Sequence, residues 1–272
     1  MRIAVITDIH GNIQALEAIL EDVRTQAVDE IVIAGDLVNI HPNSRRCFER
    51  VMALGCVVLQ GNHEEYVYSV GGTLNQERFQ SVRWTQAQFS QTELQMMRTL
   101  PRVLHRPDVL ITHSTARSLS ETIGDDTPDT DLRAMFAATT EPFIVRGHNH
   151  RWFTRNWDKR TLFSLESAGL PLGGRLEAQY AILTKQKGWS LEQRFVSYDR
   201  QAALADFNDA YVQEIGALGH LLKLEFVHGK GFLNRFLQQY LEAVDAKRTS
   251  LEAAVTQFLA AQPIVNRLFE QL

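Results

Sequence analysis

Short apolar runs alternate with helical stripes through the first half of the chain. Continuous apolar runs at 3–6, 31–34 and 56–59 each lead into polar residues and a turn, and the runs at 109–112 and 143–145 repeat this arrangement. After the first run, apolar residues recur at helical spacing, at Ile13, Leu16, Ile19, Leu20 and Val23. Continuous apolar runs are typical of strands covered on both faces. Their alternation with helices predicts parallel βαβ units.

The pattern changes twice in the second half. From Trp152 to Val196, short alternating stretches and turn signals predict antiparallel hairpins. The turn signals lie at 157–160, 173–174 and 187–188. From Asp199 onward, helical stripes at 204–215, 232–244 and 251–259 predict about three or four helices. We therefore expect an α/β domain over residues 1–200 and a helical extension over 201–272, packed on that domain or on a partner subunit.

Polar residues that can bind metals follow the predicted strands. They are Asp8, His10, Asp36, Asn62, His63, His113, His148 and His150. Open α/β sheets bind their ligands at the carboxyl ends of the strands, so these side chains are expected to converge. If strand geometry continues past residue 6, Asp8 and His10 point to the same side, because residues two apart share a face.

This set of donors also indicates which metals bind. Carboxylate, imidazole and amide groups suit Mn, Fe, Zn, Ni or Co better than Ca. A single tetrahedral zinc takes about four ligands. The larger set favours two metals that share a bridging carboxylate, an arrangement that holds the attacking and leaving oxygens in phosphoryl displacement.

In chain order, these motifs resemble the signature of the calcineurin-like metallophosphoesterases. The motifs are Asp8-x-His10, Gly35-Asp36, Gly61-Asn62-His63-Glu64, His113 and Gly147-His148-Asn149-His150. The start of the chain at 8–12 and the segment 162–169 are similar to the small bacterial and archaeal branch of that family, which includes phosphodiesterases. The resemblance covers residues 1 to about 200 and implies a four-layer α/β/β/α sandwich, here with a C-terminal helical extension.

The resemblance also implies roles for the residues. One metal would be held by Asp8, His10, Asp36 and His150, and the other by Asp36, Asn62, His113 and His148. Manganese is the first expectation for both. His63 would be catalytic, acting on the scissile phosphate as an acid or a charge stabiliser, and Asn12 and His63 would contact the substrate. Glu64 stands where the family usually has Asp, and we expect it to orient His63 and hold it protonated.

Several of these residues have simpler interpretations when taken alone. Asp8 could be a helix N-cap, Asn62 an ordinary turn residue, and His10 or His150 a surface histidine. Arg117 and Arg146 could bind a phosphate, but solvent-exposed charge is the stronger interpretation for both. The motifs favour metal binding because they occur together and in order.

Composition narrows the possible functions. The net charge of −4 leaves no basic footprint, so a nucleic-acid partner is not expected. No stretch is long and apolar enough to span a bilayer. The two cysteines, Cys47 and Cys56, are expected to be reduced core residues of a cytoplasmic protein.

Together these observations predict metal-dependent hydrolysis of a small phosphodiester or nucleotide by a water activated at two metals. The alternatives are a phosphomonoesterase or protein phosphatase of the same fold, and a non-catalytic metal-binding scaffold for protein interaction. The C-terminal helices could also form a homodimer.

Overall fold

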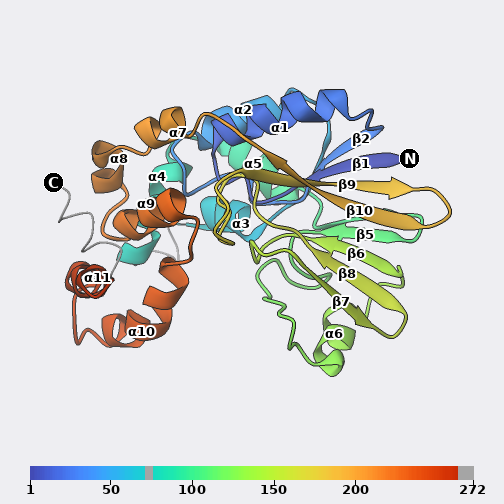
Figure 1. Ribbon diagram of the computed structural model, residues 1–272. Coiled ribbons are helices and arrows are strands. Elements are labelled where there is room, and N and C mark those ends of the chain that lie inside the picture. Colours follow the sequence, from blue (N-terminus) through green and yellow to red (C-terminus); the bar gives the residue numbers. More distant parts are fainter. Residues whose placement is uncertain (71–75, 263–272) are drawn as a thin grey trace.

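The computed structural model describes residues 1–70 and 76–262. Within these residues, two five-stranded sheets lie face to face (Figure 1). The first sheet has the order β10-β9-β1-β2-β3, and the second has the order β4-β5-β6-β8-β7. The strands are β1 (Arg2–Ile6), β2 (Glu30–Ile33), β3 (Val57–Val58), β4 (Val103–Arg106), β5 (Val109–Thr112), β6 (Phe143–Arg146), β7 (Phe153–Trp157), β8 (Arg160–Ser164), β9 (Ala178–Lys185) and β10 (Trp189–Val196).

The helices fall into a group around the sheets and a group at the end of the chain. The first group is α1 (Ile13–Thr25), α2 (Ser44–Met52), α3 (Asn62–Ser69), the short 3₁₀ helix η1 (Glu77–Phe79), α4 (Gln80–Gln86), α5 (Gln91–Thr99) and α6 (Asp129–Met135). The second group is α7 (Arg200–Asp206), α8 (Asp209–Glu214), α9 (Leu218–His228), α10 (Leu233–Asp245) and α11 (Leu251–Ala260).

Each sheet has a parallel centre and antiparallel additions. Strands β1, β2 and β3 pair in parallel, as do β5, β6 and β8, whereas β9 runs antiparallel to β1. The parallel pairing that the apolar runs predicted is therefore confirmed. The sequence did not predict β4, which pairs antiparallel with β5.

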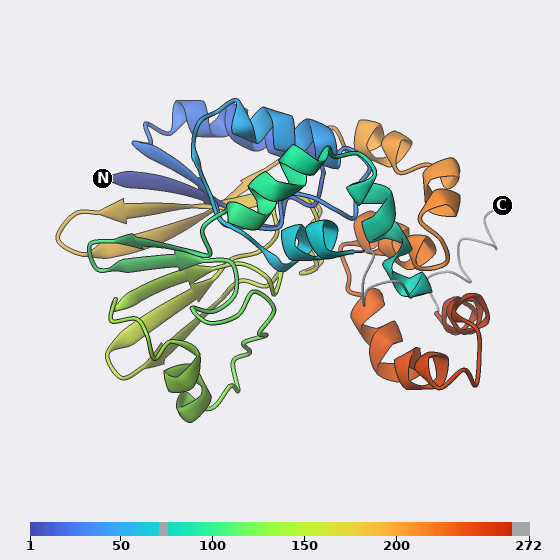
Figure 2. The same ribbon diagram turned by 180° about the vertical axis from the view of Figure 1, so that it is seen from behind.

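Three apolar clusters separate four layers. One cluster lies between the sheets and includes Val5, Val32, Ile111 and Val145. A second joins the outer face of the first sheet to α1 and its neighbours, which lie on the side away from the second sheet (Figure 2). A third packs α6 against the outer face of the second sheet. This confirms the predicted α/β/β/α sandwich.

The helical extension lies at the end of the molecule away from the N-terminus (Figure 1). One apolar cluster joins α7, α8 and α9 to Ile40 and Leu170, and another lies among α9, α10 and α11. The extension has five helices in its described part rather than three or four. The stripe at 204–215 forms two helices because the Asn208 side chain accepts the Tyr211 N–H and starts a new one. The boundary at residue 200 remains a prediction.

Two of the three predicted hairpin turns are present. The turn at 157–160 joins β7 to β8, and the turn at 187–188 joins β9 to β10. Gly173 instead forms an isolated antiparallel bridge with Lys230, next to α9. No helix among residues 1–70 and 76–262 has the length and apolar character needed to cross a membrane.

Candidate metal centre

The first two candidate ligands lie in a turn rather than at the end of a strand. Strand β1 ends at Ile6, and Asp8 and His10 adopt left-handed φ angles of 56° and 51°. The expectation that continued strand geometry aligns them is therefore wrong. Their positions are set by hydrogen bonds to the loop after β2. Asp8 N–H donates to Gly35 O at 3.0 Å, and His10 N–H donates to Asp36 O at 2.9 Å.

Two glycines allow these loops to come close together. A Cβ on Gly61 would lie 2.2 Å from Asp36 Oδ1, and a Cβ on Gly147 would lie 2.4 Å from Asp8 Oδ2. No side chain fits at such distances. The glycines that precede Asn62 and His148 are therefore needed for the backbone to pass beside the carboxylates.

Asp8, His10 and His150 form one group of donors. Their nearest ligand atoms all lie within 4.8 Å of one another. His150 Nε2 lies 3.1 Å from Asp8 Oδ1 and 3.0 Å from His10 Nε2. His150 Nδ1–H donates to Leu170 O at 2.8 Å, which leaves a lone pair on Nε2 directed at the group.

Asp36, Asn62, His113 and His148 form a second group. Asn62 Oδ1 lies 2.9 Å from His113 Nε2 and 2.8 Å from His148 Nδ1. His113 Nδ1–H donates to Ala34 O at 3.0 Å, so its Nε2 also faces the group and offers a lone pair once it is deprotonated. Asp36 Oδ2 lies 3.3 Å from His113 Nε2 and 3.8 Å from His10 Nε2. Asp36 therefore lies between the two groups.

The donors fit two divalent metals of the kind that carboxylates and imidazoles bind. Asp8 Oδ1 is buried without a hydrogen-bond partner. Buried polar atoms are rarely left unpaired without a reason, and an ion is one such reason. The short distance between His10 Nε2 and His150 Nε2 also brings together two nitrogens that can each offer a lone pair.

Burial and mutual charge strongly shift the pKa values in this cluster. Burial lowers the pKa of His113, but the Asp36 carboxylate raises it more strongly, to about 9. Burial and the neighbouring His113 charge lower the pKa of His148 to about 3. Burial raises the pKa of Asp36, yet His113 and His63 lower it more, to well below its usual range. The carboxylates are therefore ionised and available to bind a cation.

His63 lies beside both groups on the first turn of α3. Its Nε2 is 3.9 Å from Asp36 Oδ2, and its ring centroid is 4.6 Å from that of His10. Its Nδ1 accepts a hydrogen bond at 2.8 Å from Asn39 Nδ2, while Asn39 Oδ1 accepts one at 3.2 Å from Thr85. The hydroxyl of Thr85 thus fixes the Asn39 amide, which keeps the proton of neutral His63 on Nε2. The sequence interpretation missed Asn39, and its only signal is a polar residue within the apolar segment 37–40.

The structure does not support the expected contact between Glu64 and His63. Glu64 accepts four backbone N–H bonds instead, from Asp36, Leu37, Val38 and Gly61. Burial lowers the pKa of His63, contrary to the expected protonated state. Glu64 therefore holds the loop after β2 against the start of α3, and the extra methylene of Glu relative to Asp is used for this reach.

Asn12 and Arg146 hold nearby backbone segments in place. Asn12 is fully buried and caps α1, with Oδ1 accepting the Ala15 N–H and Nδ2 donating to Gly169 O. Its polar atoms are thus already paired, which does not favour the expected substrate contact. Arg146 is also fully buried, so the interpretation of solvent-exposed charge is wrong for it. Its guanidinium donates to Ser114 O, Asn149 Oδ1 and Glu121 O and thereby holds the loop of His148.

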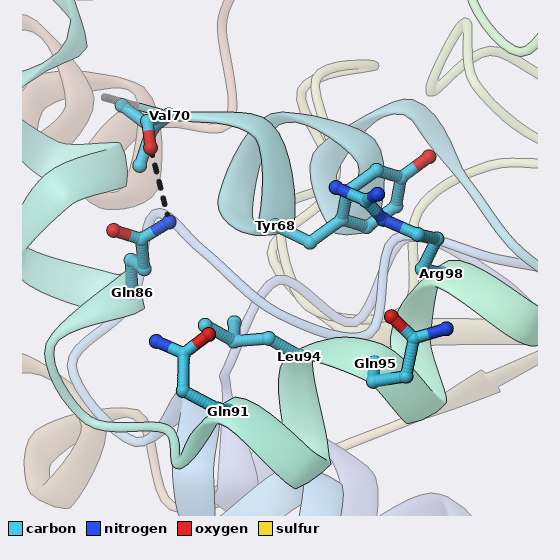
Figure 3. Close-up of a pocket in the computed structure, with 7 residues that line it drawn as sticks. All are labelled: Tyr68, Val70, Gln86, Gln91, Leu94, Gln95 and Arg98. Carbon is cyan, nitrogen blue, oxygen red and sulfur yellow. Dashed lines mark hydrogen bonds between the residues drawn. The ribbon is translucent and has the colours of Figure 1, made fainter. Parts of the chain in front are cut away.

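A cavity of about 600 Å³ opens from the metal centre toward α9 and α10. A second hollow of about 420 Å³ lies between α3 and α5 and has no described histidine or carboxylate in its lining (Figure 3). It is lined by Tyr68, Val70, Gln86, Gln91, Leu94, Gln95 and Arg98. Of these two cavities, the first combines the donor cluster with room for a substrate.

Comparison with known families agrees with this geometry. The model of the calcineurin-like phosphoesterases matches residues 1–152, more than half of the chain. The chain belongs to the calcineurin-like phosphoesterase family. A metallophosphoesterase is a hydrolase, and the fold and donor cluster described above are consistent with that activity. The resemblance noted from the sequence is confirmed, and the non-catalytic scaffold is not favoured.

Individual relatives of this phosphoesterase are distant. It is 26% identical over 227 residues to an uncharacterised protein from Methanocaldococcus jannaschii, covering 74% of this chain and 89% of the relative. The crystal structure of a metallophosphoesterase from Sphaerobacter thermophilus is 25% identical, with a TM-score of 0.69, and covers 84% of this chain and 100% of that one. A hypothetical protein from Pyrococcus horikoshii shares the fold at 15% identity, with a TM-score of 0.70 and coverage of 84% and 98%.

Proposed function

We propose that this phosphoesterase hydrolyses a small phosphodiester or nucleotide with two divalent metals. The observation that carries this proposal is the pair of donor groups on either side of Asp36, with His63 beside them. One ion would be held by Asp8, His10, Asp36 and His150. The other would be held by Asp36, Asn62, His113 and His148. When bound, such ions lower the pKa of a coordinated water and supply a hydroxide near neutral pH.

The protein's own residues then position the substrate and the proton. His63 is partly exposed to the cavity, and its Nε2–H is available because Nδ1 accepts from Asn39. We assign this N–H to a phosphoryl or leaving-group oxygen, which it stabilises by a hydrogen bond as charge develops. Asn39 acts as a positioning residue, because it sets the tautomer of His63 without reaching the cavity's metal ligands.

Two substitutions test the assignment. Asp36→Asn is expected to abolish turnover of bis(4-nitrophenyl) phosphate and to remove bound metal, because the shared carboxylate is lost. His63→Ala is expected to lower kcat while leaving the metal content unchanged, measured by elemental analysis after dialysis.

His105→Ala is the matched control, since His105 is an exposed histidine on β4 that pairs with Glu141. It should leave both turnover and metal content unchanged. Normal turnover in Asp36→Asn would refute the site, and loss of metal in His63→Ala would make His63 a ligand.

Metal identity and ester class need their own measurements. We propose manganese, with Fe, Zn, Ni and Co as the other metals that this donor set accepts. Apo-protein supplied with each metal in turn, and assayed on matched phosphodiesters and phosphomonoesters, identifies both. A consistent preference for monoesters would favour the phosphatase alternative.

We also propose a cytoplasmic location, supported by the free thiols of Cys47 and Cys56. Cell fractionation with antibody detection tests it. A homodimer through the C-terminal helices stays a prediction, which light scattering coupled to gel filtration checks.

A further inference from the structure

The cavity at the metal centre has two chemically different ends. One end contains His10, Asp36, His63 and His148 from the donor cluster. The other end is formed by leucines of the C-terminal helices, and we define the leucine wall as Leu218, Leu222, Leu233, Leu237 and Leu241. Figure 1 shows α9 and α10 at the end of the molecule toward which β1 runs from the N-terminus.

The leucine wall follows from the spacing of its residues. Leu218 and Leu222 are four residues apart on α9, and Leu233, Leu237 and Leu241 are each four apart on α10. Residues at this spacing share one face of a helix. Both faces line the same cavity, and Leu237 and Leu241 are only half-buried there. A continuous apolar surface left open to a cavity is typical of a ligand-binding site.

The charged groups around the wall do not suit an anionic substituent. Arg78 lines the cavity, but its guanidinium contacts both carboxylate oxygens of Asp245, at 3.1 and 3.0 Å, and so joins η1 to α10. Glu225 also lines the cavity and accepts the N–H groups of Phe232 and Leu233 at the start of α10. The arginine beside α10 is thus already paired with a carboxylate. Arg151, the other arginine of the cavity lining, follows His150 at the donor end.

We propose that the leucine wall binds an apolar organic group of the phosphoester. The substrate class is then a phosphodiester with an alkyl or aryl substituent. This binding role rests on the proposed function, because it places the phosphate of the same molecule at the donor cluster. A cavity of about 600 Å³ lies within the range that holds a drug-sized ligand.

A homologous series of substrates tests this role. Alkyl 4-nitrophenyl phosphates from methyl to octyl share one leaving group and differ only in the apolar substituent. The value of kcat/KM is expected to rise about fourfold for each methylene that reaches the wall, as expected for transfer of CH₂ out of water. Alkylphosphonates of the same lengths provide a readout without turnover, because they should raise the Tm of the metal-loaded protein more as the chain lengthens.

The variants Leu241→Gln and Leu237→Gln should remove most of this dependence on chain length, so that kcat/KM for the octyl ester falls toward that for the methyl ester. Leu259→Gln is the matched control, because Leu259 is a half-buried leucine on α11 that packs in the same helical cluster but does not line the cavity. A chain ending at Gln262 should behave as the full chain does.

The possible results separate this role from the proposed function. Hydrolysis that does not depend on chain length would overturn the apolar substrate but keep the phosphoesterase. Dependence that survives in both leucine variants, or that arises only in the shortened chain, would also overturn the role of the wall. If no ester is hydrolysed with any metal, the proposed function fails, and the alkylphosphonate Tm series alone decides whether the wall binds alkyl groups.

Discussion

Replacing Glu64 by glutamine changes one atom at the centre of four backbone hydrogen bonds. Oε1 accepts from Leu37 at 2.7 Å and Val38 at 3.2 Å, and Oε2 accepts from Asp36 at 2.9 Å and Gly61 at 2.7 Å. An amide NH₂ in place of either oxygen would face two N–H donors and could accept from neither. The variant therefore loses two buried bonds in whichever orientation it adopts.

The expected loss of unfolding free energy follows from the number of hydrogen bonds lost. Burial raises the pKa of Glu64 to about 7, so its carboxylate is charged above that pH. There a hydrogen bond to a charged group contributes about 1.5–3 kcal/mol, and the loss of two destabilises the protein by about 3–6 kcal/mol. This is a large share of the roughly 5–15 kcal/mol that stabilises a typical protein. Urea unfolding with a chelator present measures it without the contribution of metal binding. The midpoint should fall while the slope of the free energy against urea stays constant.

Glu65→Gln is the neighbouring control. Glu65 forms only a partly exposed ion pair with Arg102, whose loss should cost at most about 1 kcal/mol. The reasoning is refuted if Glu64→Gln unfolds within about 0.5 kcal/mol of the parent protein, which is the usual range for a surface change. If that stable variant had also lost activity, Glu64 would act on His63 after all.

Three further outcomes are expected. Arg146→Lys keeps the charge but at most one of the three hydrogen bonds of the buried guanidinium, so urea unfolding should show a loss of about 2–4 kcal/mol. Burial raises the pKa of Glu225 from 4.5 to about 7, so its contribution to stability is complete below pH 4.5 and is lost as the pH rises through 7. That loss amounts to about 3 kcal/mol, and Glu225→Gln should therefore flatten the decline in unfolding free energy between pH 4.5 and about 7. A decline that is unchanged in this variant would contradict the assignment. Removing metal with a chelator should lower the Tm by about 5–10 °C, and Asp36→Asn should not respond in calorimetry.

The fold and the donor set could be predicted because both depend on strong local patterns. Runs such as 3–6 and 31–34 are apolar at every position, which only a strand covered on both faces explains well. The carboxyl ends of parallel strands meet at one edge, so residues that follow those runs come together whatever the details of the loops. The order of the motifs along the chain then indicated the family.

The roles of Asn39 and Glu64, and the way the C-terminal helices pack, could not be predicted. They depend on contacts between residues far apart in the sequence, and such contacts leave no local pattern. Asn39 reaches His63 from another loop, and its role requires Thr85 on a third element. Glu64 neighbours His63 in the sequence, yet its side chain points to the backbone of residues 36–38. In the tail, the apolar stripe at 204–215 continues across the break at Asn208, because residues of both α7 and α8 pack in one cluster.

The backbone of the metal centre shows why its local geometry differs from that of a strand. Asp8, His10, Asp36, His148 and His150 all have φ between 51° and 72°. Outside glycine, this conformation costs about 1 kcal/mol or more at each residue. Bonds between loops offset that cost, as when Asp8 N–H donates to Gly35 O and Ser167 donates to Asp8 O. Bonds between the loops thus contribute to holding the donors together. Because the strained conformation depends on contacts between separate loops, a residue such as Glu64 can be essential to the centre without touching metal or substrate.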